Sequence, residues 1–154
     1  MGDEKKTTPR PVGDEVAYDL ENIVKKNVYF RRVLSTSQHS QLVAMSLTKD
    51  GIGREVHPDN DQFFKVEEGG VRITLDDRYH YTLGPGQSLT VDAGRFHQVE
   101  TLDSHGNIGT PGAYAKVYTI YSPPHHPPGT IQRTDPDAKA SKEKERRKQR
   151  GTLF

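Results

Sequence analysis

The chain has 154 residues, of which 31% are hydrophobic and 28% charged, and its formal net charge is +1 at pH 7. This length predicts one domain with a substantial core. The chain contains no cysteine, which excludes disulfides, thiolate zinc sites and cysteine nucleophiles. No apolar run approaches transmembrane length, and the N-terminal residues lack the apolar stretch of a signal peptide. We therefore expect a cytoplasmic protein with no membrane partner.

Charge and proline content divide the chain into three parts. We expect residues 1–27 to form a partly disordered N-terminal arm, residues 28–130 a barrel, and residues 131–154 a flexible basic tail. Residues 139–150 carry seven basic and two acidic side chains, whereas the rest of the chain has a slight acidic excess. A solvated tail explains this run, so nucleic acid is not an expected partner.

The predicted elements are almost all strands. A short helix is expected within residues 14–26, followed by strands at 28–34, 41–48, 54–57, 62–68, 71–76, 79–83, 88–91, 97–102 and 115–121. The pair Gly69-Gly70 predicts a turn between two of these strands. Many short strands separated by turns, with no helical period among them, predict an all-β sandwich or barrel.

Three metal-capable side chains lie in one short segment of the sequence. Glu55 and His57 would point to the same face of a strand, because side chains two residues apart share a face. The four residues that follow, 58–61, are turn formers, which predicts a hairpin with Gln62 opposite His57. A carboxylate, an imidazole and a carboxamide would then meet, and divalent metals accept such ligands.

Two longer motifs contain these residues. The first reads Glu55-x-His57-x4-Gln62-x6-Gly69, and the second reads Gly86-x5-Asp92-x-Gly94-x2-His97. Their spacing resembles the two signature motifs of the cupin superfamily, over roughly residues 40–130. The chain departs from the family pattern at Glu55, Gln62 and Asp92, where cupins usually have His, Glu and Pro.

This resemblance implies a cupin double-stranded β-helix, which is a jelly-roll barrel of two antiparallel sheets with its ligands at the mouth. It also implies four metal ligands, which are Glu55, His57, Gln62 and His97. Zinc, manganese, iron and nickel are all compatible with such donors. One carboxylate on a divalent ion would leave a positive charge, and therefore a Lewis acid.

The implied ligand set of two histidines, a carboxylate and an amide is similar to that of cupin-type phosphomannose isomerases. We therefore expect a small metal-binding cupin with sugar-isomerase-like activity on a phosphorylated sugar or a related hydroxycarbonyl compound. A non-catalytic module that binds a small ligand and a metal-dependent cupin of the dioxygenase type remain alternatives. The sequence identifies no catalytic acid or base.

Without a metal, these groups would form a hydrogen-bonded polar cluster in an empty barrel. Glu55 would then need a donor such as Arg54, Lys65 or Arg95, because a buried unpaired carboxylate is costly. Three histidines in polar contexts are expected to be exposed, namely His39, His80 and His105. For His126, the alternatives are structural packing and a place at the barrel mouth.

The prolines at positions 123, 124, 127 and 128 suggest an extended arm. Such an arm could cross to a second subunit, and a homodimer is the expected assembly. The other expected partner is a small-molecule ligand.

Overall fold

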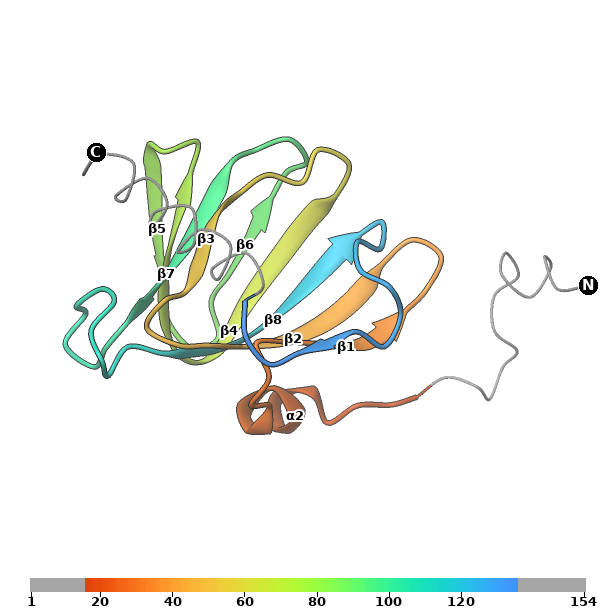
Figure 1. The fold of residues 1–154 in the computed structure, drawn as a ribbon, viewed down its shortest axis with the longest axis horizontal. Helices are drawn as coiled ribbons and strands as arrows, with labels where there is room; N and C mark the ends of the chain where they lie inside the picture. The colour runs from red at the N-terminus through yellow and green to blue at the C-terminus, as the bar shows by residue number, and fades with distance from the viewer. Residues whose placement is uncertain (1–15, 136–154) are drawn as a thin grey trace, which may run out of the picture.

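The computed structural model describes residues 16–135, which form one short helix and nine β-strands (Figure 1). The helix is α2 (Leu20–Lys26), and the strands are β1 (Arg31–Thr36), β2 (Gln41–Leu47), β3 (Ile52–Glu55), β4 (Asp61–Leu75), β5 (Tyr79–Leu83), β6 (Ser88–Val91), β7 (His97–Leu102), β8 (Ala115–Ser122) and β9 (Ile131–Gln132). All strand pairings are antiparallel. The predicted all-β class is therefore confirmed. Within residues 16–135, no helix has the length and apolar character needed to cross a membrane.

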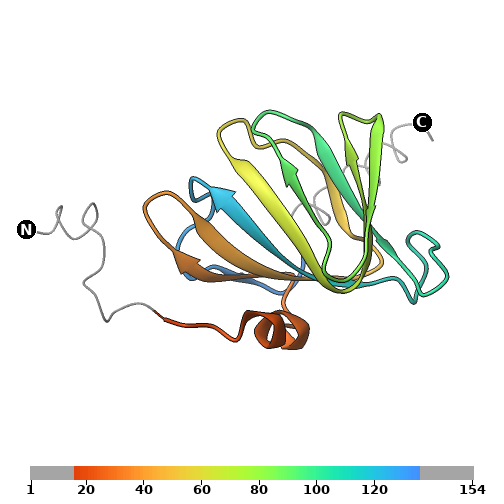
Figure 2. The same ribbon diagram turned by 180° about the vertical axis from the view of Figure 1, so that it is seen from behind.

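The strands form two arms of a curled sheet that share β4. The strand order is β3-β7-β4-β8-β2-β1-β9, and β5 and β6 also pair with β4. The second half of β4 belongs to the arm with β3, β5 and β7, and its first half belongs to the arm with β6, β8, β2, β1 and β9. Figures 1 and 2 show the two arms opening away from the bend in β4, as expected for a jelly-roll barrel.

The bend in β4 lies at Gly69-Gly70, where the sequence predicted a turn. That prediction is wrong, because β4 continues through both glycines for 15 residues. Gly69 has a φ of +76°, and a Cβ at this position would lie 2.3 Å from the carbonyl oxygen of Tyr114. Glycine is therefore needed both for its backbone conformation and for the close approach of the neighbouring strand.

A β-bulge between Val66 and Glu68 precedes this bend. A bulge adds one residue to a strand and so changes which residues face inward. The buried, inward-facing residues of β4 are Gln62, Phe64 and Val66 before the bulge and Val71, Ile73 and Leu75 after it. The bulge thus allows a single strand to line the interior of both arms.

The helix α2 covers the outer side of the sheet and contacts β2, β4 and β8 (Figure 2). Its Val24 is fully buried, and so is Ala44, which points outward from β2. A helix was expected within residues 14–26, and its observed length is seven residues. The first strand begins at Arg31, three residues later than predicted.

The proline-rich segment folds back onto its own barrel. Asn60 donates from Nδ2 to the carbonyl oxygen of Pro123 at 2.6 Å. The short strand β9 then pairs with β1. The expected extended arm is therefore wrong for residues 122–132, and β9 lies inside the range that was assigned to the basic tail. Most of that tail, like most of the N-terminal arm, lies outside the described residues.

Candidate metal centre

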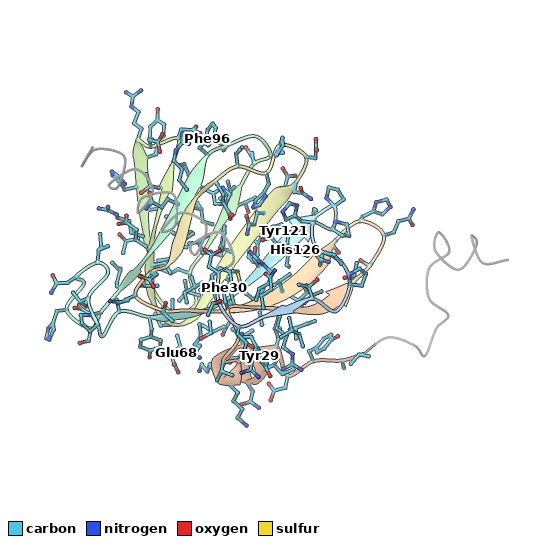
Figure 3. All side chains as sticks on the ribbon, viewed as in Figure 1. Tyr29, Phe30, Glu68, Phe96, Tyr121 and His126 are labelled. Carbon is cyan, nitrogen blue, oxygen red and sulfur yellow. The ribbon has the colours of Figure 1, made fainter. Side chains whose placement is uncertain are left out.

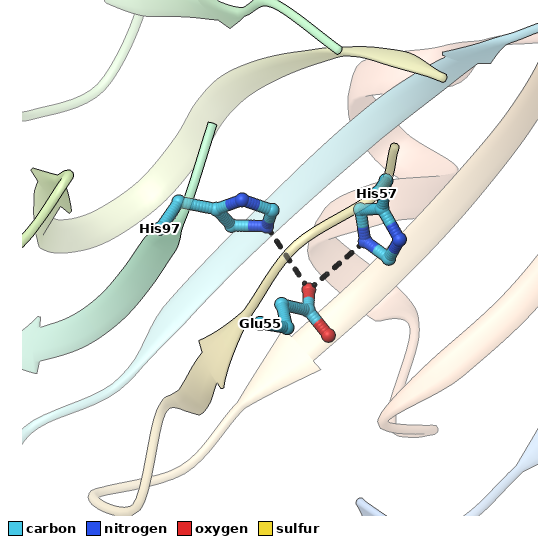
Figure 4. A group of neighbouring side chains, drawn as sticks. All are labelled: Glu55, His57 and His97. Atoms are coloured by element: carbon cyan, nitrogen blue, oxygen red, sulfur yellow. Dashed lines mark hydrogen bonds and ion pairs between the residues drawn. The ribbon is translucent and has the colours of Figure 1, made fainter. Parts of the chain in front are cut away.

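Glu55 and His97 are brought together by strand pairing. Glu55 is the last residue of β3 and is the register partner of His97, the first residue of β7. Side chains of directly paired residues lie side by side on the same face of a sheet. His57 follows just beyond the end of β3, and its ring turns back toward Glu55 (Figure 4). The potential ligand atoms of these three residues all lie within 4.8 Å of one another.

One carboxylate oxygen is the point on which both imidazoles converge. Glu55 Oε1 lies 3.2 Å from His57 Nε2 and 3.1 Å from His97 Nε2 (Figure 4). His97 Nδ1 lies 3.3 Å from the carbonyl oxygen of Arg95, an acceptor that requires the proton to be on Nδ1. In a neutral imidazole, Nε2 of His97 then directs a lone pair at the Glu55 oxygen. Such an arrangement needs a proton or a metal cation between the two atoms.

The Glu55 carboxyl group is ionised at neutral pH. Burial by itself raises the pKa of this group, but hydrogen bonds and charge from His57 and His97 outweigh the effect and lower the pKa from 4.5 to about 2. His57 is 8% exposed and His97 is 2% exposed. The result is a fixed negative charge between two buried imidazoles, and this charge favours a cation.

None of the three cations considered as partners of Glu55 reaches it. Arg54 donates to Asp77 at 2.7 Å, Lys65 pairs with Glu67 at 2.8 Å, and Arg95 donates to Asp76 at 2.9 Å. Of the two alternatives for Glu55, a metal or one of these donors, the second is wrong for all three cations. Each of them instead has an acidic neighbour, and the two histidines are the partners of Glu55.

The predicted hairpin between His57 and Gln62 is also wrong. Residues 58–59 do form a turn, but β3 pairs with β7 in one arm, whereas Gln62 of β4 pairs with Val91 and Tyr121 in the other arm. Residues 56–60 therefore cross between the arms. The turn-forming residues correctly predicted a turn. They did not predict which strands pair on either side of it, because long-range contacts determine that pairing.

Gln62 nevertheless carries buried polar atoms with poor hydrogen bonding. Its side chain is 1% exposed, and within residues 16–135 neither its Oε1 nor its Nε2 makes a well-formed hydrogen bond. Its only polar contact there is a weak one with the Tyr121 hydroxyl, which opposes the rise in the pKa of that phenol. A buried amide without well-formed hydrogen bonds is costly, and a bound cation would accept its oxygen as a ligand. Gln62 pairs in register with Tyr121, whose ring lies 5.5 Å from that of His57. Gln62 as the fourth ligand stays a prediction.

Two residues beside the cluster were missed in the sequence. The exposed ring of His125 lies 4.3 Å from that of His57 and 5.2 Å from that of Tyr121. Burial and the charge of His57 lower the pKa of His125. Tyr121 could have been found by alternation, because Ala115, Val117, Thr119 and Tyr121 are the inward-facing residues of β8. His125 belongs to the folded-back segment, which has no such pattern.

Gln41 anchors that segment above the cluster. Its Oε1 accepts hydrogen bonds from the backbone N–H groups of His125 at 3.2 Å and His126 at 3.0 Å. Its Nε2 donates to the carbonyl oxygen of His126 at 2.7 Å and to Thr36 Oγ1 at 3.0 Å. This fully used amide fixes His125 against His57.

The remaining histidines follow the sequence-based expectations. The three that were expected at the surface, namely His39, His80 and His105, are exposed. His126 is half-buried, with its ring 5.2 Å from that of Tyr121 (Figure 3). His126 therefore packs against the barrel and also lies at its mouth, so both of the alternatives considered for this residue apply.

Comparison with known proteins identifies the family. A cupin domain model matches residues 44–105, which include all four predicted ligands. Uncharacterized protein L612 of Acanthamoeba polyphaga mimivirus is 41% identical over 119 residues, covering 75% of this chain and 70% of that protein. The chain belongs to the cupin superfamily.

Two further relatives of this cupin are bacterial. The crystal structure of BH2720 from Bacillus halodurans shares 34% identity with a TM-score of 0.70, and the match covers 86% of this chain and 96% of that one. Uncharacterized protein YrkC of Bacillus subtilis is 32% identical over 131 residues, covering 81% of this chain and 66% of that protein. This cupin therefore spans just under two thirds of the length of YrkC.

The residues of this cupin fit a metal ion. Two imidazoles and a carboxylate already converge. The buried Gln62 amide, which lacks a well-formed hydrogen bond, is the register partner of a tyrosine beside them. Nitrogen and oxygen donors of this kind suit divalent zinc, manganese, iron and nickel. The cluster could hold any of these ions, and its chemistry does not select one.

Proposed function

We propose that this cupin holds one divalent metal ion through Glu55, His57, Gln62 and His97 and uses it to bind a small hydroxycarbonyl compound. The observation that carries the proposal is the convergence of His57 Nε2 and His97 Nε2 on a single oxygen of Glu55. A bound divalent ion would supply a Lewis acid that polarises a carbonyl group. Glu55 contributes the only negative charge of the four ligands, so the centre would keep a positive charge and favour oxygen-rich ligands.

The activity that we propose is isomerisation of a phosphorylated sugar or a related hydroxycarbonyl compound. Such a reaction moves a proton between neighbouring carbon atoms and needs a base beside the ligand. The imidazole of His125 is placed for this role, because it is exposed and touches His57 and Tyr121. Tyr121 would act as a hydrogen-bond donor. Its pKa lies well above the ordinary value, first because the phenol is buried and then because of the Glu55 charge.

A second candidate function is oxygenation with iron. The observation that favours it is the cluster itself, because two histidines and one carboxylate form the usual ligand set of non-haem iron oxygenases. Oxygen consumption by the iron-loaded protein, absent from the zinc-loaded protein, would support this candidate over the isomerase.

Elemental analysis of the purified protein tests the metal centre. We expect about one transition-metal ion per chain, and none in the H57A/H97A double variant. The matched control is H39A/H105A, which removes two exposed histidines and should retain the metal. Equal metal content in the two double variants would contradict the proposed centre.

Turnover is tested separately on metal-loaded protein with mannose 6-phosphate. We expect turnover above that of metal-free protein, and its loss in H125Q with metal content unchanged. A protein that retains metal but converts no mannose 6-phosphate under any metal would contradict the isomerase proposal and favour a non-catalytic binding module.

Assembly and location complete the proposal. We propose a cytoplasmic homodimer, which size-exclusion chromatography with light scattering would test by the mass in solution. The segment 122–132 packs on its own barrel, so a dimer would use a different surface.

A further inference from the structure

Arg31 is a buried cation that lacks a buried anion. Its side chain lies at the start of β1 and is 6% exposed, a position in which an unpaired charge is costly. The guanidinium donates from Nη1 to Gln132 Oε1 on β9, but its Nε is buried and has no hydrogen-bond partner. No carboxylate within residues 16–135 forms an ion pair with Arg31. This guanidinium therefore has a donor and a charge available for an anion.

A second polar side chain near Arg31 also has a buried atom without a hydrogen-bond partner. Nε2 of the half-buried His126 is itself buried without a hydrogen-bond partner. The segment that follows His126 runs along the strand of Arg31, because the carbonyl oxygen of Thr130 accepts from the Val33 N–H at 2.9 Å and Gln132 is the register partner of Arg31. Burial lowers the pKa of His126 to about 4, and the Arg31 charge adds to this effect. Arg31 and Gln62 also reach the hydroxyl group of Tyr121 by weak hydrogen bonds, which oppose the rise in its pKa, and the Nε donor of Arg31 stays without a partner.

Tyr121 connects these groups to the metal centre. Its ring lies 5.5 Å from that of His57 and 5.2 Å from that of His126. The Glu55 carboxylate and the Arg31 guanidinium both influence its hydroxyl group. Among the described residues, Glu55 forms ion pairs with His57 and His97 and none with Arg31, so it does not neutralise the guanidinium. A ligand of a few heavy atoms could therefore contact both regions.

We propose that Arg31 and His126 form a carboxylate subsite, and that the ligand is a small hydroxy- or keto-carboxylate whose hydroxyl or carbonyl oxygen reaches the metal centre. The inference rests on the proposed metal centre, and of the two ligand classes in the proposed function it favours the related hydroxycarbonyl compounds over a phosphorylated sugar. One carboxylate balances the single guanidinium charge and can accept two parallel hydrogen bonds from it. A phosphate dianion would bring a second negative charge into a region whose nearest histidine is neutral. The ligand would enter past Glu55, whose side chain is 19% exposed, and past the exposed His125.

Calorimetric titration of the full-length, metal-loaded chain tests this subsite. The probes are glycolate and pyruvate, with neutral hydroxyacetone and inorganic phosphate for comparison. We expect R31Q to weaken binding of both carboxylates by about tenfold or more, the loss expected for a hydrogen bond to a buried charged group. Binding of hydroxyacetone and the metal content should not change. The control is R32Q, because Arg32 is the exposed neighbour on the same strand. It should bind like the unaltered chain.

Equal affinity of the unaltered chain and R31Q for pyruvate would overturn the subsite. Tighter, Arg31-dependent binding of inorganic phosphate would overturn its assignment to a carboxylate. If R31Q does not fold, R31K and H126Q serve instead: each should weaken glycolate binding, and unchanged binding in both would contradict the proposal. If the purified unaltered chain holds no metal, the proposed metal centre is contradicted, but the carboxylate subsite is not. Arg31-dependent binding of glycolate to that metal-free chain would still support the subsite.

Discussion

The interior of this cupin has two ends that the same strands build. The apolar end consists of side chains that are at most 1% exposed, namely Met45, Val66, Ile73, Val99 and Val117. The polar end consists of Arg31, Gln41, Glu55, His57, Gln62, His97, Tyr121 and His126. Strands β2, β4, β7 and β8 each contribute residues to both ends. Strand alternation sets the direction of each side chain, and residue type at the strand end determines whether it joins the core or the candidate site.

The two ends differ in how completely their groups are satisfied. Apolar side chains need only close packing, whereas buried polar groups need partners. Within residues 16–135, buried side-chain atoms without a well-formed hydrogen bond include those of Arg31, Gln62 and His126. The polar end therefore reduces the stability of the free protein and leaves groups available for a ligand, as is common at functional sites.

The largest effect is expected from a substitution that disrupts the packing of the apolar end and leaves the polar end unchanged. I73A removes most of a fully buried side chain and should lower the free energy of unfolding by about 2–5 kcal/mol, through lost burial and the cavity that remains. Urea unfolding measures this change. Metal content should remain unaltered, and loss of metal from a folded I73A would show that the two ends are not independent.

A smaller effect of opposite sign is expected at the polar end. Q62L removes two buried atoms that lack a well-formed hydrogen bond and should stabilise the metal-free protein by about 1 kcal/mol, because the desolvation cost that it removes exceeds the weak contact with Tyr121 that it also removes. It should also weaken metal affinity, because a ligand is lost. Urea unfolding and competition with a chelator measure the two effects. Q98L is the control, since Gln98 points outward from β7. A less stable Q62L with unchanged metal affinity would assign Gln62 a purely structural role.

Acid should destabilise the polar end through His126. Its pKa is about 4 in the folded chain, below the ordinary value of 6.5. Between these values the unfolded chain binds a proton that the folded chain does not, so the contribution present above pH 6.5 is lost as the pH falls toward 4. Melting temperatures of metal-free protein should therefore fall less over this range in H126Q than in the unaltered chain. The exposed-histidine variant H39Q should behave like the unaltered chain, and identical profiles for H126Q would contradict the prediction.

The smallest effect is expected outside both ends. Arg54 and Asp77 form an exposed ion pair at 2.7 Å, and such pairs contribute little to stability. Asp77 has a φ of +57°, which Asn tolerates well. D77N should therefore change neither the unfolding midpoint nor the metal content measurably. A clear loss of metal would link this surface pair to the cluster.

Much of the fold could be predicted because alternation is a local property. Alternation along the predicted strand 62–68 places Gln62, Phe64 and Val66 on one face, and all three are buried. Motif spacing indicated Glu55, His57 and His97 as one group, and the structure brings their ligand atoms together. That they ligate a metal stays a prediction, together with the participation of Gln62.

Other features depend on contacts between distant parts of the chain. The pairing of β3 with β7 joins residues more than 40 positions apart, and the turn formers at residues 58–59 do not encode it. Gly69-Gly70 indicated a turn, because the sequence does not show the approach of Tyr114 that requires glycine. The anchoring of His125 and His126 by Gln41 spans about 85 positions, so these neighbours of the cluster had no local signal.

The sharing of β4 by both arms limits how the length of this chain can change. One residue inserted between Gln62 and Val66 would turn Gln62 outward, because neighbouring side chains in a strand point to opposite faces. The bulge before Gly69 already shifts the register of β4 by one residue. This shift lets the inward-facing residues of both halves of the strand point into the barrel. Insertions and deletions among proteins of this kind should therefore concentrate in exposed loops such as residues 104–109. The length of β4 should be kept.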